Sequence, residues 1–483
     1  MRGTGALCLL AWLCGSPLEA QKTPEADAMF QRGSEAAKRR TGEGYRVAAA
    51  TFDSAAQLAE PRAPMKAALF RVLAAQMYLS LGRTDLAGPR ADAAVLVLRR
   101  DPKASGAWLP QGLTAAGEAR SSLGQPNQAL ALFREGLDAT LKLPASDASD
   151  AKRKRQLEGT LRSDIGSTLA ELGSLDSAAT QLQLALAARA DAVDLRGTGY
   201  TLNNMGRLQQ TLGRPDSARR LFASADAIFA AENDAVGRAI ALTNTGFSYE
   251  RERRPADAVQ WHRRALQALG NAGNPIIEAV ALNNLGRNYL MLDSLVAARD
   301  DMTAGLQAAL RVDDRWRAGW NLADLGRVEL ASGRRDSAIV LLSQGHTALD
   351  ASDDPIRAAE TLLYLGRAYA LPGPGQSYPA ALDAMAAANQ VRQGVGRRVP
   401  RDADRVSFAE QDLALTDEWA TTTLAWGGQS PDEAARAALA VSEQGRARSL
   451  LLLMHGVDST APGRNELPTI GQRYLSEIFA TAP

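Results

Sequence analysis

Glycine recurs every 40 residues through the middle of this sequence, and this spacing constrains the fold more than any other feature. Leucine stands four residues before the glycine in five of the rows, and alanine stands twelve residues after it in five. A fixed period of this size is typical of a solenoid, in which each period is one supersecondary unit that stacks on its neighbours. The glycines are Gly166, Gly206, Gly246, Gly286, Gly326 and Gly366.

The columns around these glycines predict a helical hairpin in every row. Apolar residues stand four and one residues before the glycine and three after it, so they form one face of an α-helix. Glycine on that face costs about 1 kcal/mol of helix propensity relative to alanine. Its repetition therefore indicates that a second helix packs closely there. Gly173 and Gly213 are expected to end first helices, and Pro215-Asp216-Ser217 to begin a second one.

The segment Leu-Gly-Arg-Asn-Tyr at 285–289, with Asn283-Asn284 before it and Ala298 after it, resembles a tetratricopeptide repeat (TPR). Its 40-residue length is similar to the longer-helix variety found in kinesin light chains and many bacterial scaffolds. We count nine repeats from about residue 25 to 390, looser at 25–140 and regular at 156–390. The resemblance implies an all-α fold, a right-handed α-solenoid of antiparallel helical hairpins.

The first 20 residues are expected to be a secretory signal peptide. Arg2 precedes a short apolar core at 6–13, and Leu18-Glu19-Ala20 offers a small residue at a cleavage site. We therefore expect export to the periplasm, the envelope or the exterior, with a lipoprotein or a cytosolic apolar helix as alternatives. Both cysteines, Cys8 and Cys14, lie in this segment. The mature chain is then expected to contain no disulfide, thiolate metal site or cysteine nucleophile.

Two polar segments interrupt the repeats. A linker is predicted at 143–155, where Lys152-Arg153-Lys154-Arg155 is interpreted as a solvated basic loop or, alternatively, as a docking patch for acidic groups. A second loop, rich in arginine, glycine and proline, is predicted at 391–404.

Residues 405–456 are predicted to form a C-terminal helical hairpin, followed by a tail at 457–483. Glu443, the Arg-Ala-Arg at 446–448 and the leucine run after it resemble the segment that joins TPR arrays to CHAT domains, which are caspase-like modules. The resemblance implies a CHAT-type protease as a partner at these helices. A simple capping hairpin is the alternative. Only 27 residues follow Gly456, and they contain no cysteine, so the catalytic half is expected to be missing from this chain.

The first helix of each hairpin is expected to line a concave groove. Asparagine recurs two residues before the glycine, and its amide can satisfy the main chain of an extended peptide. Arginine recurs one residue after the glycine and suits carboxylates on a partner. Alternatively, the arginines pair within their own helix, as Asp324 and Arg327 could. The predicted peptide-binding residues are Asn203, Asn204, Arg207, Asn244, Asn283, Asn284, Arg287, Asp324, Arg327 and Arg367.

Other classes of function find little support in the sequence. Lys and Arg total 55 against 54 Asp and Glu, so the chain lacks the basic excess of a nucleic-acid-binding protein. His262, His346 and His455 share no metal-like spacing and are expected on the surface or in helix packing. No phosphate-binding, dinucleotide or nucleophile-elbow motif occurs, and no run of 18 apolar residues could span a membrane.

We therefore predict an exported scaffold that binds extended protein segments, with no enzymatic activity and no cofactor. The competing hypothesis is the regulatory or substrate-recognition arm of a CHAT-type peptidase. A structural spacer in an envelope assembly is a third possibility.

Overall fold

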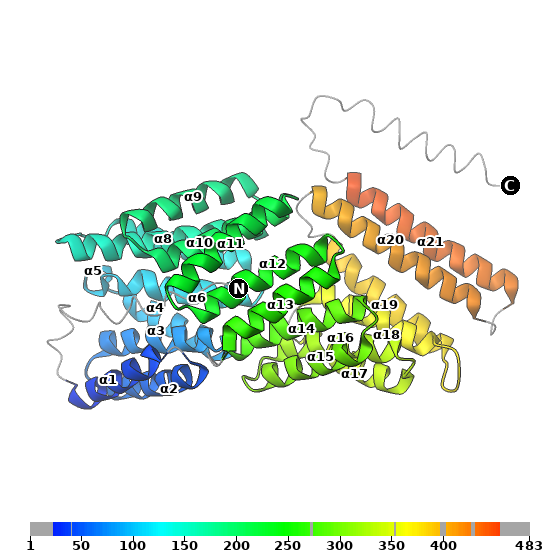
Figure 1. Ribbon diagram of the computed structural model, residues 1–483, viewed down its shortest axis with the longest axis horizontal. Helices are drawn as coiled ribbons and strands as arrows, with labels where there is room; N and C mark the ends of the chain where they lie inside the picture. Colours follow the sequence, from blue (N-terminus) through cyan, green and yellow to red (C-terminus); the bar gives the residue numbers. More distant parts are fainter. Residues whose placement is uncertain are drawn as a thin grey trace, which may run out of the picture. The chain divides into compact units, whose positions relative to one another are not determined.

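The computed structural model describes residues 23–39, 41–270, 274–351, 354–396, 402–426 and 430–454. Every regular element in these ranges is a helix (Figure 1), so the predicted all-α fold of antiparallel helical hairpins is confirmed. The chain divides into two compact units, the first ending at Thr361 and the second beginning at Leu362. None of the described helices is long and apolar enough to cross a membrane. The predicted signal peptide (1–20) and tail (457–483) lie outside the described residues.

Unit 1 is a series of hairpins in which each helix packs on the next. Its helices are α1 (Pro24–Lys38), α2 (Gly42–Ala59), α3 (Pro64–Ser80), α4 (Thr84–Leu98), the single turn α5 (Pro102–Ser105), α6 (Trp108–Ser122), α7 (Pro126–Leu141), α8 (Ala148–Glu171), α9 (Leu175–Asp191), α10 (Leu195–Thr211), α11 (Pro215–Ala231), α12 (Ala235–Arg251), α13 (Pro255–Leu269), α14 (Pro275–Met291), α15 (Leu295–Leu310), α16 (Arg315–Ala331) and α17 (Arg335–Asp350).

Helix α18 (Pro355–Ala370) contains the boundary between the units, and α19 (Tyr378–Gly396) completes the ninth hairpin. Unit 2 continues with α20 (Asp402–Ala425) and α21 (Pro431–Met454), which pack against each other as a further hairpin. In that hairpin Gly445 lies against Thr416, because a Cβ on the glycine would fall 2.2 Å from the threonine Oγ1.

The second helix of each regular hairpin packs tightly against the glycine of the first, as the sequence predicts. A Cβ on Gly206 would lie 2.4 Å from the Phe222 ring, and one on Gly286 would lie 2.6 Å from Met302 Cγ. Both contacts are closer than ordinary van der Waals distance, so only glycine fits without a shift of the second helix. The alanine column of the second helices has no exposed surface: Ala178, Ala218, Ala258, Ala298 and Ala338.

A column of capping residues begins the first helix of five successive hairpins, from α10 to α18. The side chain of Asp234, for example, accepts a hydrogen bond of 3.0 Å from the backbone N–H of Gly237, three residues later. Such a cap satisfies one of the free N–H groups at a helix start and stabilises the helix by about 1 kcal/mol. The capping residues are Asp194, Asp234, Asn274, Asp314 and Asp354.

The predicted loops at 143–155 and 391–404 are wrong over much of their length. Helix α8 already begins at Ala148, with Asp147 as its cap, because lysine and arginine favour helices once a cap begins one. Lys154 Nζ donates to the main-chain oxygens of Leu141 and Leu143 at 2.8 and 2.6 Å, so it caps the end of α7. Helix α19 likewise continues to Gly396.

Candidate functional site

The inner surface of unit 1 encloses a cavity of about 1070 Å³. It is closed on one side by a contact between distant repeats, where the turn between α3 and α4 lies against α14. A Cβ on Gly82 would fall 2.4 Å from Ile276 Cδ1, and the φ of this glycine is +75°. Arg83 Nη2 lies 3.9 Å from Asp313 Oδ2 beside it. The predicted concave groove is therefore a partly enclosed chamber within unit 1.

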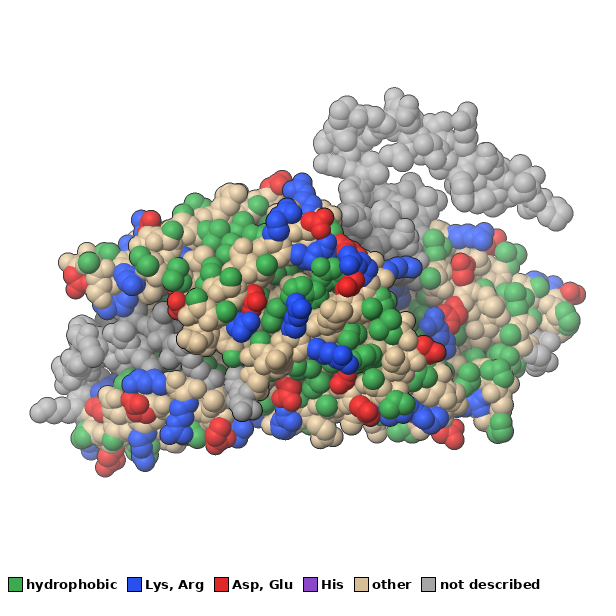
Figure 2. All heavy atoms as spheres, in the orientation of Figure 1, with side chains coloured by type: hydrophobic (Ala, Val, Ile, Leu, Met, Phe, Trp, Pro, Cys, Tyr) green, Lys and Arg blue, Asp and Glu red, His purple; other side chains and the backbone are tan. Residues whose placement is uncertain are grey.

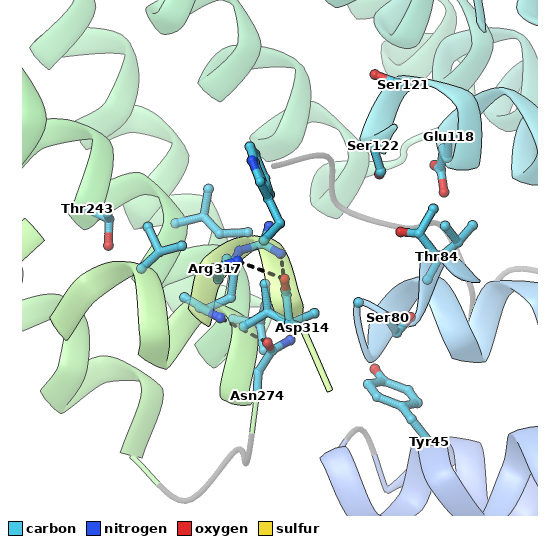
Figure 3. Close-up of a pocket in the computed structure, with 18 of the residues that line it drawn as sticks. Tyr45, Ser80, Thr84, Glu118, Ser121, Ser122, Thr243, Asn274, Asp314 and Arg317 are labelled. Carbon is cyan, nitrogen blue, oxygen red and sulfur yellow. Dashed lines mark hydrogen bonds and ion pairs between the residues drawn. The ribbon is translucent and has the colours of Figure 1, made fainter. Parts of the chain in front are cut away.

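The two walls of this chamber differ in chemistry. The wall from α2, α3, α4 and α6 carries hydroxyl groups, including those of Tyr45, Thr84 and Ser121, around the buried carboxylate of Glu118 (Figure 3). The opposite wall comes from α10, α12, α14 and α16 and is largely apolar. It carries Tyr200, Val236, Ile240, Phe247, Ile276, Ile277, Val280, Trp316 and Trp320.

Most of these apolar residues occupy two further columns of the repeat. Tyr200, Ile240, Val280 and Trp320 stand six residues before the glycine, and Val236, Ile276 and Trp316 stand ten before it. Four-residue steps keep side chains on one helix face, so these columns continue the face that the asparagine column begins. The sequence analysis missed them because the residue type changes from row to row, although the spacing alone could have identified them.

Three of the ten predicted peptide-binding residues line the chamber: Arg207, Asn244 and Asn284. The Nδ2 of Asn244 donates a hydrogen bond to Asn203 Oδ1 at 2.8 Å, and this bond fixes the orientation of the Asn244 amide. The side chain of Asn284 makes no hydrogen bond to any of the described residues. Arg207 lies 3.8 Å from Glu171. Asn284 is thus the amide on this wall with the most unused hydrogen-bonding capacity.

The predicted asparagines away from the chamber hold neighbouring repeats together. Asn203 is 1% exposed and accepts the bond from Asn244. Asn204 donates to Ser163 Oγ at 3.1 Å, and Asn283 donates to Asp324 Oδ2 at 3.1 Å.

The three remaining predicted arginines lie in ion pairs within the chain. Arg287 Nη2 bonds Glu250 of the preceding repeat, and Arg327 Nη1 lies 2.8 Å from Asp324 Oδ1. In unit 2, Arg367 makes two bonds to the carboxylate of Glu418, of 2.5 and 2.6 Å. This arrangement matches the alternative in which Asp324 and Arg327 pair on one helix. These three arginines therefore pair with carboxylates of the chain itself, and not with carboxylates of a ligand.

A charged network fixes the chamber wall between α10 and α12. Arg196 Nε and the Tyr200 hydroxyl both donate to Asp234 Oδ2, at 2.6 and 3.0 Å. Burial alone would raise the pKa of Asp234, but the charge of Arg196 and the hydrogen bond from Gly237 N–H lower it below its ordinary value. Burial raises the pKa of Tyr200, so the phenol stays protonated as a donor. The network orients Tyr200 toward the chamber as a neutral group.

Among the described residues, no group of three or more His, Cys, Asp and Glu side chains could hold a metal ion. His262 is fully buried and packs against Gly246, whereas His455 lies outside the described residues.

No protein-family model matches the chain, and no curated protein matches it by sequence. Its structure is similar to aspartyl phosphate phosphatase F from Bacillus subtilis, with 12% identity and a TM-score of 0.46 over 81% of this chain and 97% of that one. It is also similar to a signal-transduction ATPase (STAND) protein with a tetratricopeptide repeat sensor from Pyrococcus horikoshii. The identity is 14% and the TM-score 0.46, over 72% of this chain and 52% of that one. A Rap protein complexed with competence and sporulation factor is similar with 11% identity and a TM-score of 0.45, over 80% of this chain and 100% of that one. At these identities the likeness concerns the helical-repeat fold alone.

Proposed function

We propose that the protein is a scaffold that binds a segment of another polypeptide in the chamber of unit 1. The observation that carries the proposal is the wall formed by α12, α14 and α16. There apolar side chains alternate with Asn244 and Asn284 along the helix faces that line the cavity. Apolar side chains supply most of the binding free energy in such a cavity, and a few amides supply orientation. A polypeptide segment matches both, because each of its residues carries a main-chain donor and acceptor.

Site-specific photocrosslinking tests this function and does not require the partner to be identified first. Phe247 lines the chamber, whereas Leu310 on α15 is 54% exposed and does not line it. A benzoylphenylalanine at position 247 is expected to crosslink to another polypeptide in cells that express the full chain, and one at position 310 is not. Equal crosslinking at both positions, or none at 247, would contradict binding in the chamber.

Export by a signal peptide is part of the proposal and rests on the sequence of residues 1–20. A fusion of these residues to alkaline phosphatase, which is active only outside the cytoplasm, is expected to be active. The same fusion with Leu9 and Leu10 changed to Arg is expected to be inactive, because charge in the apolar core prevents translocation. Activity in both fusions, or in neither, would contradict export.

A second candidate function is that of the recognition arm of a CHAT-type peptidase. The sequence of α21 around Glu443 and Arg446 favours it, and both residues are exposed on this helix. The leucine run that begins at 450 belongs to α21, but its side chains lie outside those described. A caspase-like frame with a histidine and a cysteine directly downstream in the genome is expected under this hypothesis. Its absence there would favour the scaffold alone.

A further inference from the structure

We infer that the chamber selects an uncharged, apolar segment of its partner, and not an acidic one. This inference rests on the proposed function and adds the chemistry of the ligand. It departs from the expectation that the arginines of the repeat hold carboxylates.

The first argument is that the charges on the wall from α8 to α16 balance one another, while the opposite wall adds one arginine, Arg39, and two carboxylates, Asp85 and Glu118. The charged residues that line it between α8 and α16 are four arginines and four carboxylates, and each has an oppositely charged neighbour within 4.0 Å. Arg196 bonds Asp234 and Arg317 bonds Asp314, for example. An acidic ligand would have to replace these internal partners, and it would gain little because the carboxylates beside the arginines repel it. Figure 2 shows the same interspersion of both signs on the visible face of unit 1.

The second argument is that neutral side chains of this wall have unused hydrogen-bonding capacity, whereas the Nε of Arg317, which also lacks a hydrogen bond to the described residues, belongs to a guanidinium already paired with Asp314. Asn284 has no side-chain partner among the described residues, and Thr243, which is 6% exposed, has a hydroxyl without a hydrogen bond. Both residues line the chamber, from α14 and α12 (Figure 3 labels Thr243). An amide and a hydroxyl can bond main-chain groups of a ligand of any sequence.

The third argument is the apolar surface between these polar groups. Val280 stands four residues before Asn284, and Ile276 four before Val280, so the three side chains follow one face of α14. Trp320 and Ile240 continue this strip on α16 and α12. Burying apolar side chains of a ligand here contributes free energy in proportion to the area removed from water, and this contribution depends much less on moderate salt than ion pairing does.

The experiment uses phage-displayed random peptides selected on the full chain, followed by synthesis of the enriched peptides. The enriched peptides are expected to have uncharged, apolar cores. Their affinity for the protein is expected to change less than about twofold between about 0.05 and 0.5 M NaCl, because ion pairs are the salt-dependent part of binding. Asn284→Ala is expected to weaken binding about two- to tenfold without adding salt dependence, which corresponds to one or two lost neutral hydrogen bonds.

A matched pair of variants in one hairpin shows where the peptides bind. Val280→Arg places a charge in the chamber, and Val296→Arg places the same charge on α15 at a site that is 68% exposed. Val280→Arg is expected to weaken binding at least about tenfold, because an apolar ligand would bury an unpaired charge. Val296→Arg is expected to bind as the wild type does. Circular dichroism checks that both variants keep their helices.

The possible failures separate the inference from the function on which it rests. Acidic or basic peptides whose affinity falls with salt, and whose affinity Val280→Arg changes in either direction, would overturn the inference and leave the binding function standing. Enriched peptides that bind Val280→Arg as well as the wild type, or no enrichment at all, would overturn both.

Discussion

His262 occupies a position where its imidazole destabilises the protein. It faces Gly246 from α13, is fully buried, and neither of its ring nitrogens has a hydrogen-bond partner among the residues that the structure describes. The equivalent positions of the other regular hairpins hold apolar side chains. They are Leu182, Phe222, Met302 and Leu342. We therefore predict that His262→Met stabilises the protein, since Met302 shows that methionine fits beside the same glycine column.

The size of this effect depends on pH in a defined direction. Burial, followed by the charge of Arg287, lowers the pKa of His262 from 6.5 to about 3. The native state therefore keeps the ring neutral, while the unfolded state binds a proton below pH 6.5. Stability is unaffected by this titration above pH 6.5 and falls by about 1.4 kcal/mol per pH unit as the pH drops toward 3. At pH 5.0 the loss reaches about 2 kcal/mol, because the protonated ring is accessible only in the unfolded state.

Two contributions are thus expected in His262→Met. At pH 7.5 the variant gains about 1–3 kcal/mol, because two unsatisfied polar nitrogens are removed from the core. At pH 5.0 it gains about 2 kcal/mol more. Urea unfolding followed by circular dichroism at both pH values measures the two gains as shifts of the midpoint. Leu182→Met is the matched control in the same column, and its effect is expected to be below about 1.5 kcal/mol and equal at both pH values.

Two results would refute this reasoning about His262. A gain that is the same at pH 7.5 and pH 5.0 would mean that the native state also binds the proton, so the ring is not held neutral. A loss of stability at pH 7.5 would mean that the two nitrogens have partners, for instance ordered water, which the variant removes.

Backbone and packing predictions follow from the turns and the glycine column. Arg253 has a φ of +58° at the turn position that Gly213 occupies one repeat earlier. This left-handed backbone conformation is unfavourable for residues with a Cβ, so Arg253→Gly is expected to raise the free energy of unfolding by about 1 kcal/mol. An unchanged or lower melting temperature would contradict this. Gly206→Ala is expected to cost about 1–3 kcal/mol because its Cβ would overlap the Phe222 ring. Gly394→Ala, where no atom of the described residues would lie within 4 Å of the new Cβ, is the control and is expected to be neutral or stabilising. Equal calorimetric effects of the two alanines would refute the close-packing argument.

The period and the residue types within it were sufficient to predict the fold. Glycine recurs at the place of Gly206 in all six regular repeats, and alanine at the place of Ala218 in five, because each hairpin must solve the same packing problem between its two helices. The helical start of α8 was missed because a basic run was interpreted as a loop, although Asp147 provides the cap.

The partners of the groove arginines were less predictable. Arg287 pairs with a carboxylate 37 residues earlier, and Arg367 with one 51 residues later. Sequence spacing identifies a partner three or four residues away on one helix, as for Arg327 and Asp324. A partner in another repeat depends on how the hairpins are stacked, which the period does not specify.

The same distinction explains where information about the ligand lies in a repeat protein. A column that holds one residue type in every row, such as Gly166 to Gly366, is fixed by contacts that every hairpin makes internally. A ligand contacts each row at a different point along its length, so the residues that recognise it differ from row to row. The column with Tyr200, Ile240, Val280 and Trp320 has this character: it keeps its place on the helix face and its exposure to the chamber, while its side chains change. In this chain the invariant columns therefore account for the fold, and the variable column facing the cavity is the one whose substitution is expected to change which segment binds.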